Sequence, residues 1–269
     1  MAPYSFTAGS GPLLVSMPHD GTHVPPDIAG RLTEDARPLP DTDWHVGRLY
    51  DFLDGNRVSV LQATVSRYVV DLNRPPDGAA LYPGRDETGV CPTTTFAGQP
   101  LYRPGQAPDA AEIADRVATY WQPYHDKLRD EIARLIARHG VAILWEAHTI
   151  KSRVPRFFDG TLPDLNFGTA DGGAAAPALL DRLTDVVRAQ TDFTCAVNAT
   201  FKGGYITRAY GRPDGGCHAV QLELVQATYM DEAPPFTFDE AKAGRLRPLL
   251  ARLIEAVVAA GTLLHDGAP

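Results

Sequence analysis

A helix pattern that leads directly into a buried strand pattern constrains this chain more than any other feature. Apolar side chains recur at three- and four-residue steps from residue 111 to residue 139, which predicts a long amphipathic helix with a kink at Pro123. Gly140 ends this helix, and the run Val-Ala-Ile-Leu-Trp at 141–145 is typical of a strand buried on both faces. A helix followed at once by such a strand favours an α/β fold with a mainly parallel sheet.

The remaining segments repeat this alternation. Strand-like apolar runs occupy residues 13–17, 57–63, 66–71 and 219–224, and helical patterns occupy residues 43–53, 175–191 and 239–260. For the helix at 43–53, Asp41 or Thr42 is the expected N-cap and Gly55 the expected end. Residues 75–110 are rich in Pro, Gly and Thr and are expected to form an irregular lid or the wall of a site. A single domain over residues 1–269 is expected, because the chain shows no internal repeat.

The composition limits both the partners and the metal ligands. Lys and Arg number 25 and Asp and Glu 33, a formal net charge of −8, so a general attraction to nucleic acid or anionic lipid is not expected. The first residues lack the pattern of a secretory signal, and no apolar run reaches the roughly 18 residues that cross a bilayer, so we expect a cytoplasmic protein. Three widely spaced cysteines, Cys91, Cys195 and Cys217, disfavour a disulfide framework and a CxxC zinc site. Any metal is therefore expected to bind mainly His and carboxylate ligands. The sequence carries no signal of an oligomeric state.

Titratable side chains follow or lie within four of the expected strands. They are His19, Asp71 with Arg74, Glu146 with His148, and Glu223. Open α/β sheets bind ligands at the carboxyl ends of their strands, so convergence of these groups at one edge would make a metal site.

Each of these residues also has a plainer explanation. His19 and His23 have the spacing of a helical zinc pair, but Gly21 and the prolines at 25–26 oppose a helix there, so His19 is either a ligand or a loop histidine, and His23 is a supporting or structural residue. Glu146 and His148 share one face of their strand, where they either form a site or reach solvent. Asp43 could be a first-turn acid of the helix, and Glu223 could form a buried ion pair with an arginine.

Three arginines supply candidate anion-binding groups. Arg67, Arg74 and Arg208 would form a receptor for a small anionic substrate if they converge, since the guanidinium fork matches a carboxylate; singly, each could be a solvated surface residue. Gly203 and Gly204 let the backbone approach a ligand closely, or form a simple turn.

Five segments taken together resemble a known family. They are Pro18–Gly21, Asp41–His45, Ser66–Arg74, Trp145–Thr149, and Phe201–Gly211 with Gln221–Leu224. In this order they are similar to the N-formylglutamate amidohydrolase (deformylase) family of histidine degradation, over residues 12 to about 235. The resemblance implies a three-layer α/β/α hydrolase fold with a mixed, mainly parallel sheet, of the zinc-exopeptidase (phosphorylase/hydrolase) type, distantly similar to zinc carboxypeptidases and aspartoacylase.

The resemblance also implies roles for particular residues. His19 and His148 match the two histidine ligands of one divalent metal, expected to be zinc, although manganese, cobalt or iron suits the same ligand types. The distant relatives place a carboxylate ligand three residues after the first histidine, where this chain has Thr22. Asp43 is the expected substitute, with Asp20 and Glu146 as competitors.

The implied reaction is hydrolysis of the formamide bond of N-formyl-L-glutamate. Glu223 matches the general base, Asn73 and Arg74 match the binders of one substrate carboxylate, Arg208 is assigned to the other, and Arg67 is expected to stabilise the oxyanion. Two alternatives remain: a related deacylase acting on N-formylaspartate or another N-acyl amino acid, and a non-catalytic carboxylate-binding protein that retains the fold.

Overall fold

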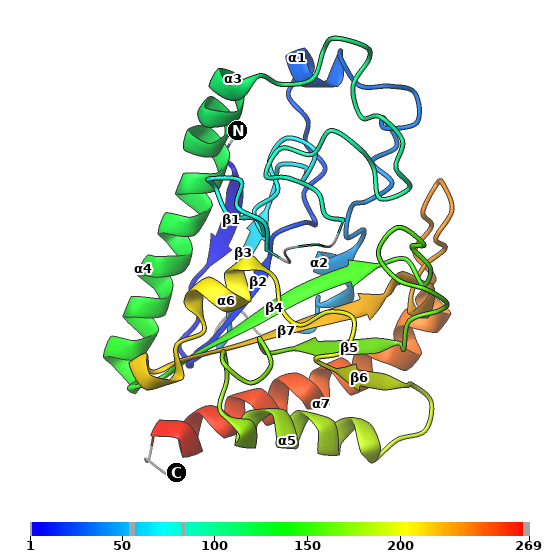
Figure 1. Cartoon of the computed structure of the whole chain (residues 1–269). Coiled ribbons are helices and arrows are strands. Elements are labelled where there is room, and N and C mark those ends of the chain that lie inside the picture. Colours follow the sequence, from blue (N-terminus) through cyan, green and yellow to red (C-terminus); the bar gives the residue numbers. More distant parts are fainter. Residues whose placement is uncertain (1, 54–56, 82–83, 85, 266–269) are drawn as a thin grey trace.

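A mixed sheet of seven strands runs through the protein, in the order β1-β3-β2-β4-β7-β5-β6 (Figure 1). The computed structural model describes residues 2–53, 57–81, 84 and 86–265. Four neighbouring pairs are parallel, and the pairs β1–β3 and β5–β7 are antiparallel. The strands are β1 (Tyr4–Thr7), β2 (Leu13–Met17), β3 (Ser59–Ala63), β4 (Ala142–Ile150), β5 (Leu165–Gly168), β6 (Cys195–Val197) and β7 (Cys217–Val225).

Helices cover both faces of this sheet. Figure 1 shows the long helix α4 along one face, while α5 and α7 lie side by side against the other. This arrangement confirms the predicted α/β/α class with a mixed, mainly parallel sheet. The α-helices are α1 (Pro26–Ala29), α2 (Val46–Leu49), α3 (Ala110–Arg116), α4 (Gln122–His139), α5 (Pro177–Arg188), α6 (Tyr205–Tyr210) and α7 (Glu240–His265). The π-turn η1 (Val117–Trp121) joins α3 to α4, and the short 3-10 turns are η2 (Pro213–Gly215) and η3 (Gln226–Thr228).

Alternation along the two central strands divides their side chains between the two layers. On β4, Ile143, Trp145 and Ala147 pack in the core formed with α5 and α7. Ala142 and Leu144 point the other way, into the core formed with α4. Because strand side chains alternate, Glu146 and His148 lie on the same face of β4 as Ala142 and Leu144, nearer the carboxyl end of the strand. The same argument places Gln221 and Glu223 on that face of β7, after Ala219. Polar groups thus occupy this face beyond the apolar contacts with α4.

The expected helix over 111–139 is present but not continuous. It starts at Ala110, passes through the π-turn η1 and continues as α4 from Gln122, so the interruption falls immediately before Pro123. Proline lacks an N–H and cannot make the normal i→i−4 hydrogen bond, which fits an interruption of the ladder here. Gly140 ends α4 in the left-handed conformation, as expected.

Two expected elements were wrong in form. The helix predicted over 43–53 is reduced to the four residues of α2, because His45 adopts a left-handed backbone with φ 65° and the helix begins only at Val46; Gly55 lies outside the described residues. The strand predicted over 66–71 is a turn, in which the Val69 N–H donates to the Ser66 carbonyl at 2.9 Å. Tyr68 and Val69 are buried against loop residues, and Val70 packs in the core between the sheet and α4.

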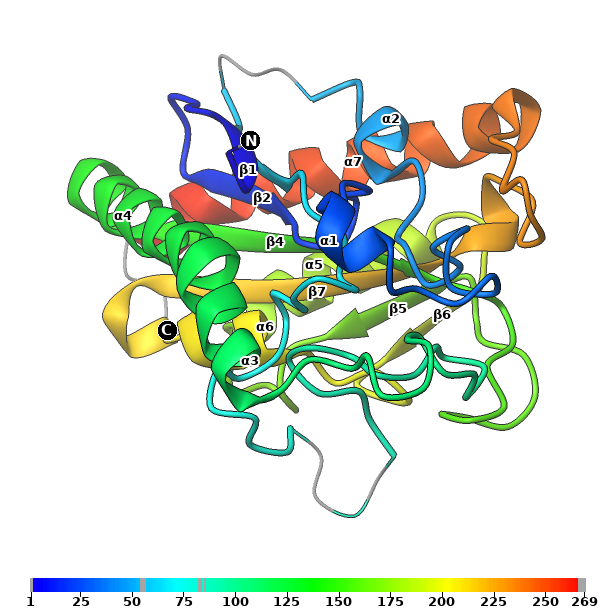
Figure 2. The same ribbon diagram turned by 90° about the horizontal axis from the view of Figure 1, so that it is seen from above.

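The other expected helices and strands are confirmed, with shifted ends, whereas β1, β5, β6, α1 and α6 were not predicted. Residues 75–81, 84 and 86–109 contain no helix and no multi-residue strand, as expected for an irregular wall. Viewed from above in Figure 2, α1 and the loops coloured blue and cyan lie in front of the central strands. Within the described ranges, no helix is both long and apolar enough to span a membrane.

Candidate metal centre and cavity

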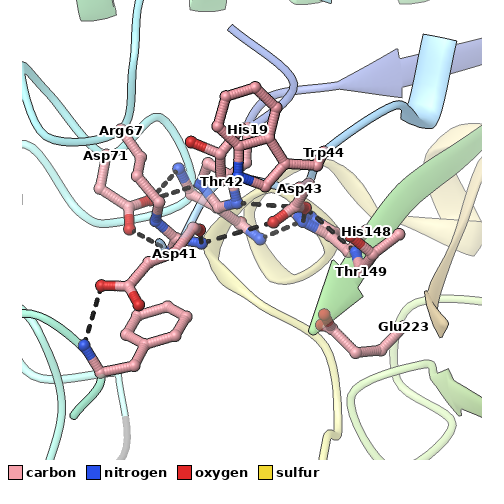
Figure 3. Close-up of polar contacts among 12 residues, drawn as sticks. His19, Asp41, Thr42, Asp43, Trp44, Arg67, Asp71, His148, Thr149 and Glu223 are labelled. Carbon is pink, nitrogen blue, oxygen red and sulfur yellow. Dashed lines mark hydrogen bonds and ion pairs between the residues drawn. The ribbon is translucent and has the colours of Figure 1, made fainter. Parts of the chain in front are cut away.

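Two histidines and one aspartate meet at the carboxyl edge of the central strands. His19 lies just after β2, His148 lies in β4, and Asp43 belongs to the loop before α2. Asp43 Oδ2 is 3.1 Å from His148 Nδ1 and 3.7 Å from His19 Nδ1. One ligand atom from each of the three buried side chains lies within 4.8 Å of the others. Figure 3 shows the Asp43 carboxylate lying between the two imidazoles. This His-Asp-His cluster could hold a metal ion.

Backbone groups of His19, just after β2, and of Thr149, in β4, hold Asp43 in place. Its N–H donates to the His19 carbonyl at 3.1 Å, and its Oδ2 accepts from the Thr149 N–H at 3.1 Å. Asp43 therefore precedes the helix and is not a first-turn acid. Asp20, a competing carboxylate, faces α2 instead, accepting from the N–H groups of Val46 and Gly47 and from the Gln62 amide.

The second nitrogen of each imidazole also has a polar partner. His19 Nε2 is 2.7 Å from Asp71 Oδ1, and His148 Nε2 is 3.0 Å from Asn73 Nδ2 and 3.4 Å from Glu146 Oε2. Metal-binding histidines commonly donate their second N–H to an acceptor, which fixes the ring and leaves the other nitrogen for the metal. Asp71 can accept from His19 and Glu146 from His148, whereas Asn73 Nδ2 can only donate. Glu146 thus lies on the side of His148 away from Asp43, which separates it from the three clustered ligand atoms.

The charges around His148 favour a cation at this place. Burial acts to lower the pKa of His148, but its hydrogen bonds to Asp43 and Glu146 and their negative charges raise that pKa to about 10. Burial acts to raise the pKa of Asp43, yet hydrogen bonds to His148 and His19 hold it well below its usual range. Asp43 Oδ1 is buried and has no hydrogen-bond partner among the described residues. The donor set fits a divalent metal with nitrogen and oxygen ligands.

Arg67 and Asp71 form a buried layer behind the cluster. Arg67 Nη2 donates to Asp71 Oδ2 at 2.7 Å, and Arg67 Nη1 is 3.6 Å from Asp43 Oδ1. The guanidinium carbon lies 4.6 Å from the centre of the Phe96 ring. Arg67 also lines the adjoining cavity, so it faces both the candidate ligands and the space for a substrate. Asp71 was among the titratable groups expected to converge at this edge, but it was given no role, and its contact with His19 was not predicted.

Glu223 lies beside His148 on the neighbouring strand. The parallel register of β4 and β7 pairs His148 directly with Glu223, and Glu223 Oε2 accepts from the Gln221 amide at 3.1 Å. Burial raises the pKa of Glu223 to about 7, with Asp43 adding to the rise and His148 and Arg67 opposing it. In Figure 3 this carboxyl group points toward the cluster and makes no drawn contact with it. A carboxyl group with this pKa can accept and return a proton at neutral pH.

A cavity of about 350 Å³ opens beside these groups. Its walls include His19, His148, Glu223 and Gln221, together with Asn73, Arg74 and Gly204. Leu81, Asp86, Glu87 and Phe96 come from the irregular segment 75–110, which therefore forms a wall of the site.

Asn73 and Gly204 fit closely together at this wall. Asn73 Oδ1 accepts from the Ile206 N–H at 2.8 Å, while the Gly204 N–H donates to Gln221 Oε1 at 2.7 Å. A Cβ atom on Gly204 would lie 2.3 Å from Asn73 Nδ2, so only glycine allows this approach. Gly203, with φ +106°, does not line the cavity but sets the turn before α6.

Two arginine positions differ from the sequence-based expectation. Arg208 lies on α6, where its Nε donates to the Gly203 carbonyl at 2.9 Å, and it is not among the residues lining the cavity. Arg156, which the sequence reasoning did not single out, lines the cavity together with Arg67 and Arg74. The one available signal was its place soon after the strand that carries His148. The structure therefore brings His19, Asp43, Arg67, Asn73, Arg74, His148, Gly204 and Glu223 together, and leaves Arg208 and Gly203 outside the cavity wall.

Fold and site together define a class, that of α/β proteins with a candidate metal centre and a buried carboxyl group beside it at the carboxyl edge of the sheet. Within that class the chain belongs to the N-formylglutamate amidohydrolase family, whose model matches residues 11–230. It is 50% identical over 257 residues to the N-formylglutamate deformylase of Pseudomonas aeruginosa, covering 96% of each chain. It is 47% identical to the enzyme of the same name from Pseudomonas putida, again with 96% of each chain covered.

The crystal structure of N-formylglutamate amidohydrolase from Ralstonia eutropha JMP134 has the same fold. It superposes with a TM-score of 0.82 over 100% of both chains, at 24% sequence identity. The family model and the two Pseudomonas relatives confirm the family resemblance seen in the ordered sequence segments.

Proposed function

We propose that this protein hydrolyses the formamide C–N bond of N-formyl-L-glutamate, giving formate and L-glutamate. Its 50% identity to a curated N-formylglutamate deformylase supports this reaction. The observation that carries the proposal is the pairing of Glu223 with His148 across β4 and β7, since it sets a carboxyl group with a pKa of about 7 beside the candidate metal cluster. We further propose that the reaction belongs to histidine degradation in the cytoplasm, as the family resemblance implies.

His19, Asp43 and His148 are the proposed ligands of one divalent metal, with zinc as the proposed ion. Three protein ligands leave a position open, as catalytic zinc sites require. A metal bound there polarises a carbonyl group and lowers the pKa of water. Asp71 and Glu146 are the proposed acceptors that orient the two imidazoles through their second nitrogens.

The protein's own groups carry the proton. Glu223 accepts a proton from the water that attacks the formyl carbon and then returns it to the departing amine nitrogen. Arg67 faces the cavity next to Asp43 and is the proposed stabiliser of the negative charge that develops on the formyl oxygen. Asn73 and Arg74 line the cavity and are the proposed binders of the substrate carboxylate nearest the reacting bond.

A formate-release assay combined with metal analysis tests this function. The purified protein is analysed for bound metal and assayed with N-formyl-L-glutamate, N-formyl-L-aspartate and N-acetyl-L-glutamate, before and after chelation. We expect formate release with N-formyl-L-glutamate as the best substrate, loss of activity on chelation and its return with zinc. No formate from the metal-loaded protein, or a clear preference for another N-acyl amino acid, contradicts the proposal. Full activity after complete metal removal contradicts its metal dependence.

A further inference from the structure

The proposed substrate carries two carboxylates, and each needs a cationic partner in the cavity. The arginines of the cavity differ in the groups that they already bind. Arg67 pairs with Asp71, whose side chain is fully buried, so this guanidinium is committed to a partner that cannot leave. Arg74 donates through Nε to the Thr88 carbonyl at 2.8 Å and, among the described residues, forms no ion pair. Arg156 pairs with Asp86, whose side chain is 57% exposed. Arg74 and Arg156 are therefore the two cavity arginines that can bind a substrate carboxylate without breaking a fully buried ion pair.

The guanidinium of Arg156 is held in a fixed orientation by one of its nitrogens. Nη1 donates to Thr94 Oγ1 at 2.9 Å and to the Thr95 carbonyl at 2.7 Å. Nε and Nη2 form the opposite edge of the fork, and they bind the two Asp86 oxygens at 2.7 and 2.8 Å. This two-point geometry is the one by which arginine recognises a carboxylate.

Asp86 is the weaker member of this pair. Arg156 is only 18% exposed, and Asp86 lines the cavity with its carboxylate largely in water. An ion pair with an exposed partner contributes little stability, because water and salt screen it. A substrate carboxylate can thus replace Asp86 on the same edge of the guanidinium at small cost.

We infer that Arg156 binds the side-chain carboxylate of the substrate, on the edge that Asp86 occupies, and so determines the preference for an acidic N-formyl amino acid. This inference rests on the proposed function and names a second carboxylate receptor for it. Asn73 contacts His148 directly, so the Asn73–Arg74 pair lies next to the candidate metal cluster and suits the α-carboxylate. Arg156 then takes the carboxylate farther from the reacting bond. Arg208, outside the cavity wall, has no part in it.

The test compares N-formyl-L-glutamate with N-formyl-L-glutamine, which has nearly the same shape but a neutral end. We expect Arg156→Gln to lower the ratio of kcat/KM for the acidic over the neutral substrate by roughly 10- to 100-fold, the range for losing hydrogen bonds to a charged group. Arg156→Lys keeps the charge but loses the fork, and should lower the ratio by less. Arg153→Gln removes the same charge at an exposed position outside the cavity wall and serves as the matched control.

An unchanged ratio in Arg156→Gln, or an equal fall for both substrates, overturns the inference. Asp86→Asn should have the opposite effect. It removes the carboxylate that competes for Arg156 and should lower KM for N-formyl-L-glutamate, so a raised KM contradicts the replacement of Asp86 by the substrate carboxylate. If the wild-type protein releases no formate, the proposed function fails by itself. In that case, calorimetry measures the affinity of the wild-type and Arg156→Gln proteins for each of the two N-formyl compounds. Equal affinities of the wild-type protein for both compounds overturn the inference.

Discussion

At the scale of single residues, the register between β4 and β7 decides what Glu223 can do. His148 and Glu223 are directly paired, and Glu146 is paired with Gln221. Strand side chains alternate, so a shift of one residue would turn Glu223 toward the core that contains α5 and α7 and bring Leu222 or Leu224 to the cavity. The apolar residues between the polar ones specify the register, because they must face the opposite core.

Glu223→Gln tests the proposed acid–base role with almost no change of shape. We expect kcat for formate release to fall by about 10²- to 10⁴-fold, the usual contribution of a positioned acid–base group, because an amide cannot take the proton. Metal content should stay at the wild-type level, since Glu223 is not among the three clustered ligands. Glu255→Gln, on the exposed side of α7, is the control. Retained turnover would contradict the acid–base role of Glu223, and loss of metal would indicate that Glu223 is a metal ligand.

Most residues of the candidate site could be proposed from the sequence because they lie at or near the ends of strands. His19, His148 and Glu223 were found by this rule, which depends only on local apolar runs. Arg156 and Arg208 could not be separated in that way. Both lie in irregular or short segments, and which one reaches the cavity depends on the fold of the loops. Asp43 was chosen for its place in the family pattern, and its backbone contacts with His19 and Thr149 bring it to the cluster.

At the scale of elements, the π-turn and α4 support the segment that carries Asn73. Trp121, the last residue of η1, donates from Nε1 to the Arg74 carbonyl at 3.0 Å. One turn later, His125 Nε2 lies 2.8 Å from the Leu72 carbonyl, and since a carbonyl only accepts, this nitrogen carries a proton. The two rings stack with their centres 3.6 Å apart. Helix α4 therefore fixes the backbone on both sides of Asn73.

His125 should make the protein sensitive to mild acid. Burial lowers its pKa from 6.5 to about 3, so the unfolded chain takes up a proton as the pH falls below about 6.5, while the folded chain does not until about 3. Stability is therefore lost as the pH falls through this window, by about 2 kcal/mol between pH 7 and pH 5 from this group.

Urea unfolding at these two pH values checks this prediction. We expect His125→Gln, which keeps a donor for the Leu72 carbonyl but does not titrate, to lose less stability than the wild type on going from pH 7 to pH 5. His139→Gln, at the end of the same helix, is the comparison variant. Equal losses in His125→Gln and the wild type would show that this histidine is not the acid-sensitive group.

Long periodic elements were predictable, whereas short ones depend on tertiary contacts. The helix ended by Gly140 and the strands β2, β4 and β7 follow from apolar spacing alone. Strand β6 has only three residues, all half-buried, so its side chains carry little pattern. The run at 66–71 has the composition of a strand, but the hydrogen bond from Val69 to Ser66 closes a turn, and local composition does not reveal that choice.

At the scale of the whole molecule, the formal net charge of −8 opposes the approach of a dianionic substrate. Attraction must therefore come from groups at the cavity. Arg67, Arg74 and Arg156 line it, and a bound metal would add positive charge beside them.

Metal binding should stabilise the whole fold, because the three candidate ligands come together only in the folded chain. At a free zinc concentration 100 times the dissociation constant, the gain is about 2.7 kcal/mol, which corresponds to a rise in Tm of about 5–10 °C. Calorimetry of the chelated and zinc-loaded protein measures it. Asp43→Asn should remove most of this rise, whereas Asp20→Asn should keep it because Asp20 faces α2. A full rise in Asp43→Asn would contradict the proposed ligand set.

The order of the strands along the chain means that the proposed metal ligands are synthesised before the proposed base. Strands β2 and β4 are neighbours, so residues up to the end of β4 already contain His19, Asp43 and His148. Glu223 arrives only with β7, the last strand in the chain, which pairs along the whole length of β4. During synthesis on the ribosome, a nascent chain that has just completed β4 therefore carries every proposed metal ligand but lacks the proposed base. The proposed base joins the site only when β7 pairs with β4.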